Sequence, residues 1–384
     1  MKKRNLQLLT LGLFLVLTQN SLAVKLEQGT GSEAASEVTV AIGLSYTDDD
    51  GVIHKNIAGN PAKPTEKYFA TAIGIANKAS GKWSSAFGFR NTASGEYSSA
   101  FGYNNEASGR WGSAFGYKNK ASGQLGSAFG YWNAASGENS SAFGYDNKAS
   151  GERSSAFGYD NKASGRWSSA FGYENRASGQ YSSAFGYSNE ASGRSSSAFG
   201  YNNMVGKLKD DGSGKFIPDE NFGRNSLALG TEYQVTGDSS GAFGVGSFSG
   251  GYEYINEGNH SYMIGNKNKI ASGSDDNFIL GNNVAIAAGV QKSVVLGDGS
   301  ASGGSNTVSV GSSSNKRKIV NVADGTADTD AATLGQVKNL IASGGSSSTL
   351  VTDVNGLKTD MTNVKNDVNG LKTDMTNVKN DVNG

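Results

Sequence analysis

A 14-residue period in the middle of the chain restricts the possible folds more than any other feature. Each unit contains Ser-Ala-Phe-Gly, usually continued by Tyr-x-Asn-x-Ala-Ser-Gly. A unit this short cannot hold a pair of helices, which takes about 30 residues or more. It is also too polar to bury a core alone, so its backbone groups must pair with the units before and after it. The phenylalanines that mark the period are Phe87, Phe101, Phe115, Phe129, Phe143, Phe157, Phe171, Phe185 and Phe199.

Within one unit the residue types indicate two short strands and two turns. Residues 84–89 alternate at the strand period of two, while Asn91 and Ser94-Gly95 supply turn chemistry. We therefore predict an all-β head, a parallel β-roll or narrow β-helix, with one Phe per rung at an interior position. Rungs would be about 4.8 Å apart. The recurrent asparagines are expected to hydrogen-bond along the stack: Asn77, Asn91, Asn105, Asn119, Asn133 and onward to Asn203.

Looser copies of the motif extend the predicted roll to residues 38–311, with two insertions. Residues 45–69 and 204–222 are each expected to form a hairpin that leaves the roll, with Asp-Gly at its tip. The clusters Asp48–Gly51 and Asp210–Gly214 are better explained as solvated turns than as calcium loops. An EF-hand loop spreads its ligands over about twelve residues and ends in Glu.

The first 23 residues have the features of a secretory signal peptide. A basic start (Lys2 to Arg4) precedes the apolar run Leu6 to Leu17, and Ser21-Leu22-Ala23 suits a signal peptidase. The alternative, a membrane anchor, needs about 20 apolar residues, and Thr18 interrupts the run earlier. Residues 24–37 then form an N-terminal segment before the roll.

Composition argues against several classes of function. The chain has no Cys, two His, and 34 basic against 34 acidic residues. Disulfides and thiolate zinc sites are impossible without Cys, and a neutral chain has no overall field to hold nucleic acid. The acidic residues fall on variable positions, so no catalytic carboxylate pair can be singled out. We expect no enzyme activity, no metal, no cofactor and no nucleic-acid partner.

The C-terminal part is predicted to be a neck and a coiled-coil stalk. The neck, residues 312–342, would include a helix that Thr329 or Asp330 caps and that runs to about Ala342. A Gly/Ser linker at 343–349 precedes residues 350–384, where Val or Met and Leu or Val alternate at heptad spacing. The residues at these heptad positions do not decide between a two-helix and a three-helix coiled coil. Residues 357–370 recur almost unchanged at 371–384, so we expect the chain to be a fragment of a longer protein.

The order of these parts resembles the trimeric autotransporter adhesins with YadA-like heads. The resemblance rests on the Ala-(Ile/Phe)-Gly rungs, the basic stretch Lys316–Val322, the stretch Asp328–Lys338 and the following coiled coil. It implies a homotrimer in which each chain forms a left-handed parallel β-roll, and a place on the bacterial outer membrane. It also implies attachment to host matrix proteins of the collagen, fibronectin or laminin type, or to host-cell receptors. Relatives end in a membrane anchor that this chain does not contain.

A ladder of variable residues is the candidate ligand-binding surface. The pair after each Ser-Gly includes Trp83, Tyr97 and Trp111 in successive rungs, and Trp167 and Tyr181 further on. Aromatic residues accompanied by Arg are typical of interface hot spots, which favours a protein-binding face. Alternatively, the rings pack on each other or across a trimer interface. The predicted function is that of a surface adhesin, with a structural fibre for autoaggregation or biofilm formation as the alternative and a fibrous polysaccharide-cleaving enzyme as a weaker one.

Overall fold

A computed structural model describes residues 13–18, 21–28, 32–34, 39–44, 46–47, 50–63, 65–210, 212, 216–219, 221–246, 253–343 and 346–383. The chain divides into two compact units, Met1–Lys316 and Arg317–Gly384. Most of the basic and apolar start of the predicted signal peptide, residues 1–12, lies outside the described residues, as do Asp48, Asp49 and Asp211. Cleavage after Ala23 stays a prediction.

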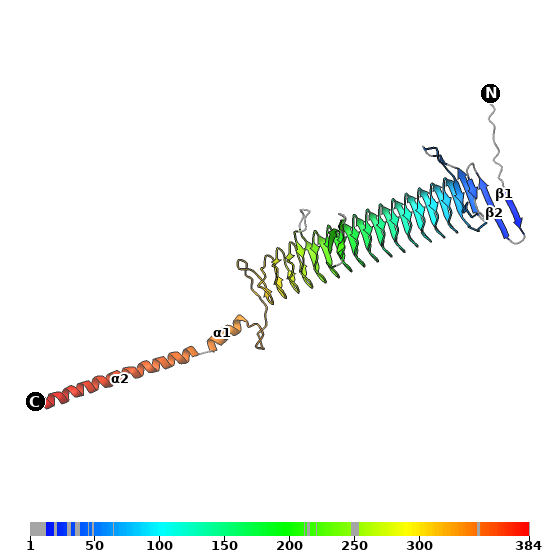
Figure 1. The fold of residues 1–384 in the computed structure, drawn as a ribbon. Helices are drawn as coiled ribbons and strands as arrows, with labels where there is room; N and C mark the ends of the chain where they lie inside the picture. Colours follow the sequence, from blue (N-terminus) through cyan, green and yellow to red (C-terminus); the bar gives the residue numbers. More distant parts are fainter. Residues whose placement is uncertain are drawn as a thin grey trace, which may run out of the picture. The chain divides into compact units, whose positions relative to one another are not determined.

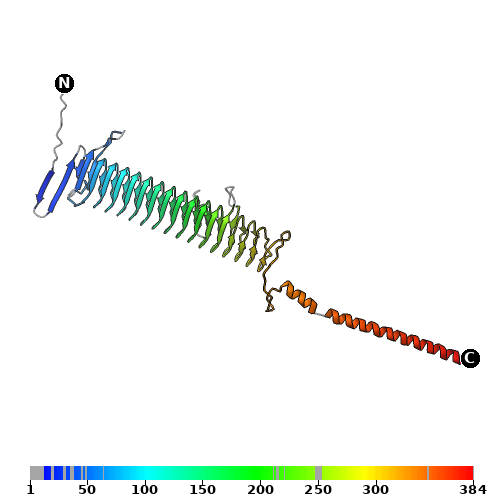
Figure 2. The ribbon, with the colours of Figure 1, turned by 180° about the vertical axis from the view of Figure 1, so that it is seen from behind.

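The first unit is a parallel β-solenoid with one long and one short strand in each rung (Figures 1 and 2). In a typical rung, β10 (Ser85–Phe89) is followed by β11 (Thr92–Ala93). In the regular rungs each strand pairs in register with its equivalent 14 residues later, so that Phe87 faces Phe101 and Ala93 faces Ala107. Long strands build a sheet of 19 strands and short strands a sheet of 16, which confirms the predicted parallel repeat fold.

The long-strand sheet contains β1 (Leu13–Thr18), β2 (Ser21–Gln28), β4 (Thr39–Leu44), β8 (Thr71–Ile75), β10, β12 (Ser99–Tyr103), β14 (Ser113–Tyr117), β16 (Ser127–Tyr131), β18 (Ser141–Tyr145), β20 (Ser155–Tyr159), β22 (Ser169–Tyr173), β24 (Ser183–Tyr187), β26 (Ser197–Tyr201), β30 (Leu227–Thr231), β32 (Gly241–Val245), β34 (Tyr262–Ile264), β36 (Phe278–Leu280), β38 (Val294–Leu296) and β39 (Val308–Ser309). The short-strand sheet contains β3 (Ser32–Ala34), β7 (Asn56–Ala58), β9 (Lys78–Ala79), β11, β13 (Glu106–Ala107), β15 (Lys120–Ala121), β17 (Ala134–Ala135), β19 (Lys148–Ala149), β21 (Lys162–Ala163), β23 (Arg176–Ala177), β25 (Glu190–Ala191), β27 (Met204–Val205), β31 (Gln234–Val235), β33 (Ile255–Asn256), β35 (Lys269–Ile270) and β37 (Ala285–Ile286).

The interior of the roll is built from small residues, which corrects the prediction of an interior Phe. Ala86 and Ala93 are fully buried between the two sheets, and Ser84 and Asn91 are buried with them. Phe87 follows Ala86 on the strand, so its side chain points to the opposite face of the sheet. The phenylalanines are only partly buried. At this strand position a 14-residue rung leaves room between the sheets for Ala and not for an aromatic ring.

Later rungs support this relation between rung length and core volume. Ile264, Leu280 and Leu296 occupy the same register position at intervals of 16 residues. In this part the fully buried side chains include Met263 and Ile279 in place of Ala. A longer rung separates the sheets enough to hold larger side chains.

The asparagine series forms a continuous hydrogen-bonded ladder inside the roll, as predicted. Asn105 is 1% exposed, and its Oδ1 accepts hydrogen bonds from the backbone N–H (2.9 Å) and the Nδ2 (3.0 Å) of Asn119. Its own Nδ2 donates to Asn91 Oδ1 at 3.0 Å, Phe101 O at 2.8 Å and Gly116 O at 2.7 Å. Each Asn therefore joins three consecutive rungs.

Two corners per rung carry non-glycine residues in the left-handed backbone region. Trp83 (φ 61°) precedes the long strand and Arg90 (φ 55°) follows it, and both positions recur through the array. The Gly within each long strand is different. Gly88 has φ 114°, and a Cβ on it would lie 2.1 Å from Gly102 O. Only glycine lets adjacent rungs approach this closely.

The excursions from the roll are shorter than the predicted insertions. In the first, β5 (Tyr46–Thr47) pairs antiparallel with β6 (Ile53–His54), and β7 is already back in the short-strand sheet. In the second, β28 (Lys207–Asp210) pairs antiparallel with β29 (Phe216–Asp219). Strand pairing also begins earlier than residue 38, because β2 pairs parallel with β4.

The second unit contains helices α1 (Leu334–Ser343) and α2 (Ser346–Asn383). The structure corrects the predicted cap: Thr333, and not Thr329 or Asp330, caps α1. Its hydroxyl accepts from the Gln336 N–H at 3.2 Å, and the Gln336 Oε1 accepts from the Thr333 N–H at 3.0 Å, which is a capping box. Asp330 instead accepts from the backbone of Thr326 and Ala327, which holds the pKa of its carboxyl below the usual value.

Helix α2 begins at Ser346, so it includes most of the predicted Gly/Ser linker. The apolar heptad positions of α2 are all more than half exposed in the single chain. Of the helices that the structure describes, neither is both long enough and apolar enough to cross a membrane. The exposed seam is consistent with the predicted coiled coil, and its partner stays a prediction. The seam residues are Val354, Leu357, Met361, Val364, Val368, Leu371, Met375, Val378 and Val382.

Candidate binding surfaces

The aromatic residues of the first corner, which precedes each long strand, form two stacks along the roll. Trp83 lies 6.1 Å from Tyr97 between ring centroids, and Tyr97 lies 5.8 Å from Trp111. Further along, Trp167 and Tyr181 stack at 4.7 Å. We call these the first-corner stacks. The structure thus brings together the five residues predicted as a ligand-binding ladder, in the two groups expected.

These rings contact each other and still remain open to solvent. Trp83 is 47% exposed, Tyr97 42%, Trp111 38% and Tyr181 46%, while Trp167 is half-buried. Stacking fixes the rings without covering their edges. The two explanations left open by the sequence, packing of the rings on one another and a binding face, are therefore compatible within one chain.

Sequence reasoning missed one member of the first stack, Phe69. It lies 4.1 Å from Trp83 between ring centroids, in a stacked arrangement, and its φ of 49° matches that of the other corner residues. The sequence placed Phe69 at the end of an insertion because the aliphatic-Gly mark is irregular there. Its position two residues before Thr71, where β8 begins, was the available signal.

An arginine guanidinium lies over a Trp ring in each stack. The Arg110 guanidinium lies 3.9 Å from the Trp111 ring centroid, and its Nε is 3.1 Å from a Glu96 carboxylate oxygen. Arg166 repeats this arrangement, 3.7 Å from Trp167 and 2.8 Å from Glu152. Cation–π and ion-pair contacts of exposed groups each contribute modestly. Together they hold a rigid aromatic surface with charges at its edge.

The outer face of the long-strand sheet carries a second and longer aromatic surface, the Phe–Tyr face. Phe101 stacks on Phe115 at 4.7 Å, and Tyr103 stacks on Tyr117 at 4.9 Å. The same contacts continue from Phe87 to Phe199 and from Phe89 to Tyr201, with centroid distances of 4.7 to 5.2 Å. A contiguous apolar face of this length is unusual on a soluble monomer.

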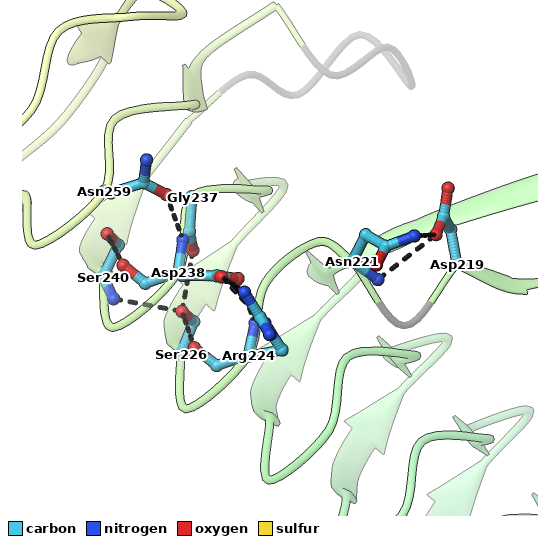
Figure 3. Close-up of polar contacts among 8 residues, drawn as sticks. All are labelled: Asp219, Asn221, Arg224, Ser226, Gly237, Asp238, Ser240 and Asn259. Carbon is cyan, nitrogen blue, oxygen red and sulfur yellow. Dashed lines mark hydrogen bonds and ion pairs between the residues drawn. The ribbon is translucent and has the colours of Figure 1, made fainter.

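A polar hollow of about 690 Å³ follows the first corner into the C-terminal rungs. Arg224 donates from its backbone N–H and its guanidinium to Asp238, and the Asp238 N–H donates to Asn259 Oδ1 at 2.9 Å (Figure 3). The Asn259 N–H in turn donates to Asp275 at 2.8 Å. These side chains accept hydrogen bonds from the corner backbone of the preceding rung and so link successive rungs. We therefore assign them a structural role.

The described residues contain no group of three or more His, Cys, Asp or Glu arranged to hold a metal ion. His260 Nδ1 lies 3.5 Å from an Asp276 carboxylate oxygen in an exposed pair.

The repeats match a known sequence family. Six overlapping or adjacent segments match the family described as the YadA head domain repeat: residues 67–91, 79–105, 93–119, 121–147, 149–175 and 177–203. Residues 67–119, 121–147, 149–175 and 177–203 match YadA head repeats. The resemblance that the sequence suggested is thereby confirmed for these rungs, which carry both first-corner stacks and the whole Phe–Tyr face.

One solved structure similar to the chain is the collagen-binding domain of the Yersinia adhesin YadA. It is 21% identical in sequence, the alignment covers 56% of this chain and 86% of that one, and the TM-score is 0.28. No curated protein matches the chain in sequence.

Proposed function

We propose that the chain is a bacterial surface adhesin that binds host matrix proteins through the first-corner stacks of its YadA-type head. The observation that carries this proposal is the pair of rigid, solvent-exposed aromatic stacks edged by Arg110 and Arg166. Aromatic and arginine side chains dominate the binding energy of protein interfaces. Because the rings are already stacked, little conformational freedom is lost when a partner binds.

The proposed assembly is a homotrimer in which the Phe–Tyr face and the α2 seam are covered by other copies of the chain. The two faces belong to different units, and each is apolar and exposed in one chain. Copies that lie in parallel present the same ring at the same height, since every rung repeats the last. Three chains related by a rotation form a closed ring of identical contacts, which leaves no apolar face open. Export by the predicted signal peptide and attachment at the outer membrane complete the proposal.

The test of assembly is the solution mass of the chain by light scattering, with an expected value of about three chains. Replacing Phe101, Phe115 and Phe129 by Ser is expected to lower this mass or to promote dissociation at micromolar concentration. The same substitution of three surface residues, Lys78→Ser, Lys148→Ser and Arg176→Ser, is the control. A monomeric wild-type chain would contradict the proposed assembly.

The test of adhesion is binding of the trimeric chain to immobilised collagen, fibronectin and laminin. The variant Trp83→Ser/Tyr97→Ser/Trp111→Ser is expected to lose at least about tenfold in affinity, since each hot-spot ring contributes about 2 kcal/mol or more. The triple variant Lys78→Ser/Lys148→Ser/Arg176→Ser, which changes three exposed residues outside the stacks, is the matched control. Clumping of cells that display the chain, without binding to any matrix protein, would favour the structural-fibre function instead.

A further inference from the structure

The second corner, which follows each long strand, contains a groove of about 560 Å³ that the first-corner stacks do not share. Arg90, Asn104, Lys118 and Trp132 occupy the same corner position in four successive rungs. Thr92, Glu106 and Lys120, from the neighbouring short strands, form another part of the lining.

The groove is open because its central positions are small. Along the stack, Asn104 lies between Arg90 and Lys118, and the backbone of each of these two is one rung, about 4.8 Å, from that of Asn104. In the rung of Trp132, the short strand begins with Ala134, where the neighbouring rungs carry Lys120 and Lys148. The indole therefore has no long short-strand side chain of its own rung beside it. On the long-strand side the Tyr131 ring lies 5.4 Å away between centroids, and the indole is still 44% exposed.

Cationic groups exceed carboxylates in this part of the corner. Glu106 is paired with Lys120 at 3.1 Å, and Asp146 with Lys148 at 3.2 Å. Lys118 lies over two rings, 5.2 Å from the Tyr117 centroid and 5.3 Å from the Trp132 centroid. Lys118 is exposed, so its ammonium lies beside the indole and can donate hydrogen bonds to a ligand. Arg90 adds a second cation two rungs earlier.

The same corner five rungs after Arg90, at Asp160, offers an internal comparison. There the groove has about 230 Å³ and is lined by Asp160, Lys162, Glu174 and Arg176. Its charges alternate, with Asp160 and Lys162 paired at 3.3 Å, and the described lining contains no aromatic ring. The excess of cations and the exposed indole are thus particular to the groove between Arg90 and Trp132, which we call the Trp132 groove.

We propose that the Trp132 groove binds an acidic polysaccharide. A sulfate or carboxylate group would lie between Arg90 and Lys118, where charge-assisted hydrogen bonds are strongest. The apolar face of a neighbouring sugar ring would pack on Trp132, since burial of its C–H surface against an aromatic ring is favourable. An open groove at a solvent corner suits a chain-like ligand that enters and leaves at both ends.

Binding of the full trimeric chain to immobilised heparin, hyaluronan and dextran tests this proposal. We expect the acidic polymers to bind and neutral dextran not to bind, with affinity that falls as salt rises. Retention of heparin alone identifies sulfate as the recognised group, and retention of hyaluronan as well identifies carboxylate. Trp132→Ser is expected to weaken binding about fivefold or more with an unchanged dependence on salt.

The decisive comparison is between two double variants of equal charge change. Arg90→Gln/Lys118→Gln is expected to weaken binding of heparin by at least about tenfold, whereas Lys162→Gln/Arg176→Gln leaves it unchanged. Equal losses in both variants would show non-specific attraction and overturn the proposal. So would the absence of binding in the wild type, or a change in solution mass in the first variant, which would make the groove a contact between chains. Matrix-protein binding by the first-corner stacks is a separate readout, so failure of either proposal leaves the other standing.

Discussion

Replacing one ladder asparagine by aspartate tests the account of the roll's interior. In Asn105→Asp, one carboxylate oxygen keeps the two hydrogen bonds that Asn105 accepts from Asn119. The other oxygen replaces Nδ2 and meets three acceptors: Asn91 Oδ1 at 3.0 Å, Phe101 O at 2.8 Å and Gly116 O at 2.7 Å. A protonated carboxyl can donate to one of the two carbonyls and leaves the other, while Asn91 Oδ1 still accepts the Asn105 backbone N–H at 3.0 Å. At about 1–3 kcal/mol for an unsatisfied buried group, the expected cost with the carboxyl protonated is about 1–3 kcal/mol.

The cost depends on pH in a defined direction. Burial favours the neutral acid, so we expect the folded-state pKa of the introduced carboxyl to lie above its unfolded value of about 3.9. Below pH 4 or so, both states are protonated and only the lost hydrogen bonds count. As pH rises above the unfolded pKa, the destabilisation grows until it levels off at the folded-state pKa.

Native-state hydrogen exchange of peptides from residues 85–131 is the suitable assay, because a repeat array does not unfold in a single step. Protection of these rungs is expected to fall about 30-fold or more at neutral pH. The matched control is Asn104→Asp, the same chemical change at the exposed corner residue directly before Asn105. Equal protection in the two variants at neutral pH would refute the proposed role of the ladder.

Three further outcomes follow from the same structure. Burial raises the pKa of Tyr233 to about 12, and its hydroxyl donates to Gly265 O at 2.7 Å. Folding stability is therefore expected to fall as pH rises from about 10 towards 12, and thermal melts of Tyr233→Phe should lack this fall while losing about 1 kcal/mol at neutral pH. Gly116→Ala places a Cβ 2.2 Å from Gly130 O at φ 115° and should cost more than the about 1–3 kcal/mol of backbone strain, whereas Gly212→Ala, with no atom within 4 Å, should cost only the strain. Gly356→Ala with Gly370→Ala should stabilise α2 by about 1 kcal/mol each, seen as increased helicity by circular dichroism.

The repeat period was enough to predict the stacked parallel strands, the asparagine ladder and the two first-corner stacks. These features depend only on which residues recur at the same position, because stacking places them one above another. Trp83, Tyr97 and Trp111 follow from this rule without knowledge of either sheet's shape. Burial and exposure of a given strand face depend on more than recurrence.

The main error in the sequence prediction was the face of the long-strand sheet on which the Phe side chains lie. Strand alternation separates Ala86 from Phe87, but it does not say which of them faces the interior. Hydrophobicity favours Phe inside, and the tight closure of a short rung overrides it. The Thr333 cap was missed for a related reason: Thr329, Asp330 and Thr333 are all acceptable N-caps, and only the reciprocal contact with Gln336 identifies the start of α1. Trp132 escaped notice because it occurs once in its column, where no recurrence marks it.

Because the rungs pair in register, the length of the head can change without a change in its surface chemistry. Each rung pairs with the next at a spacing of 14 residues, so gain or loss of one whole unit shifts all later rungs by about 4.8 Å and preserves every ladder. A loss of three residues would instead put a buried Ala where a corner side chain belongs, because Ala86 and Ala93 lie three residues after the corner residues Trp83 and Arg90. Reach can therefore be altered by duplicating units, while recognition is altered by substitutions at the corners. The two properties can evolve independently of each other.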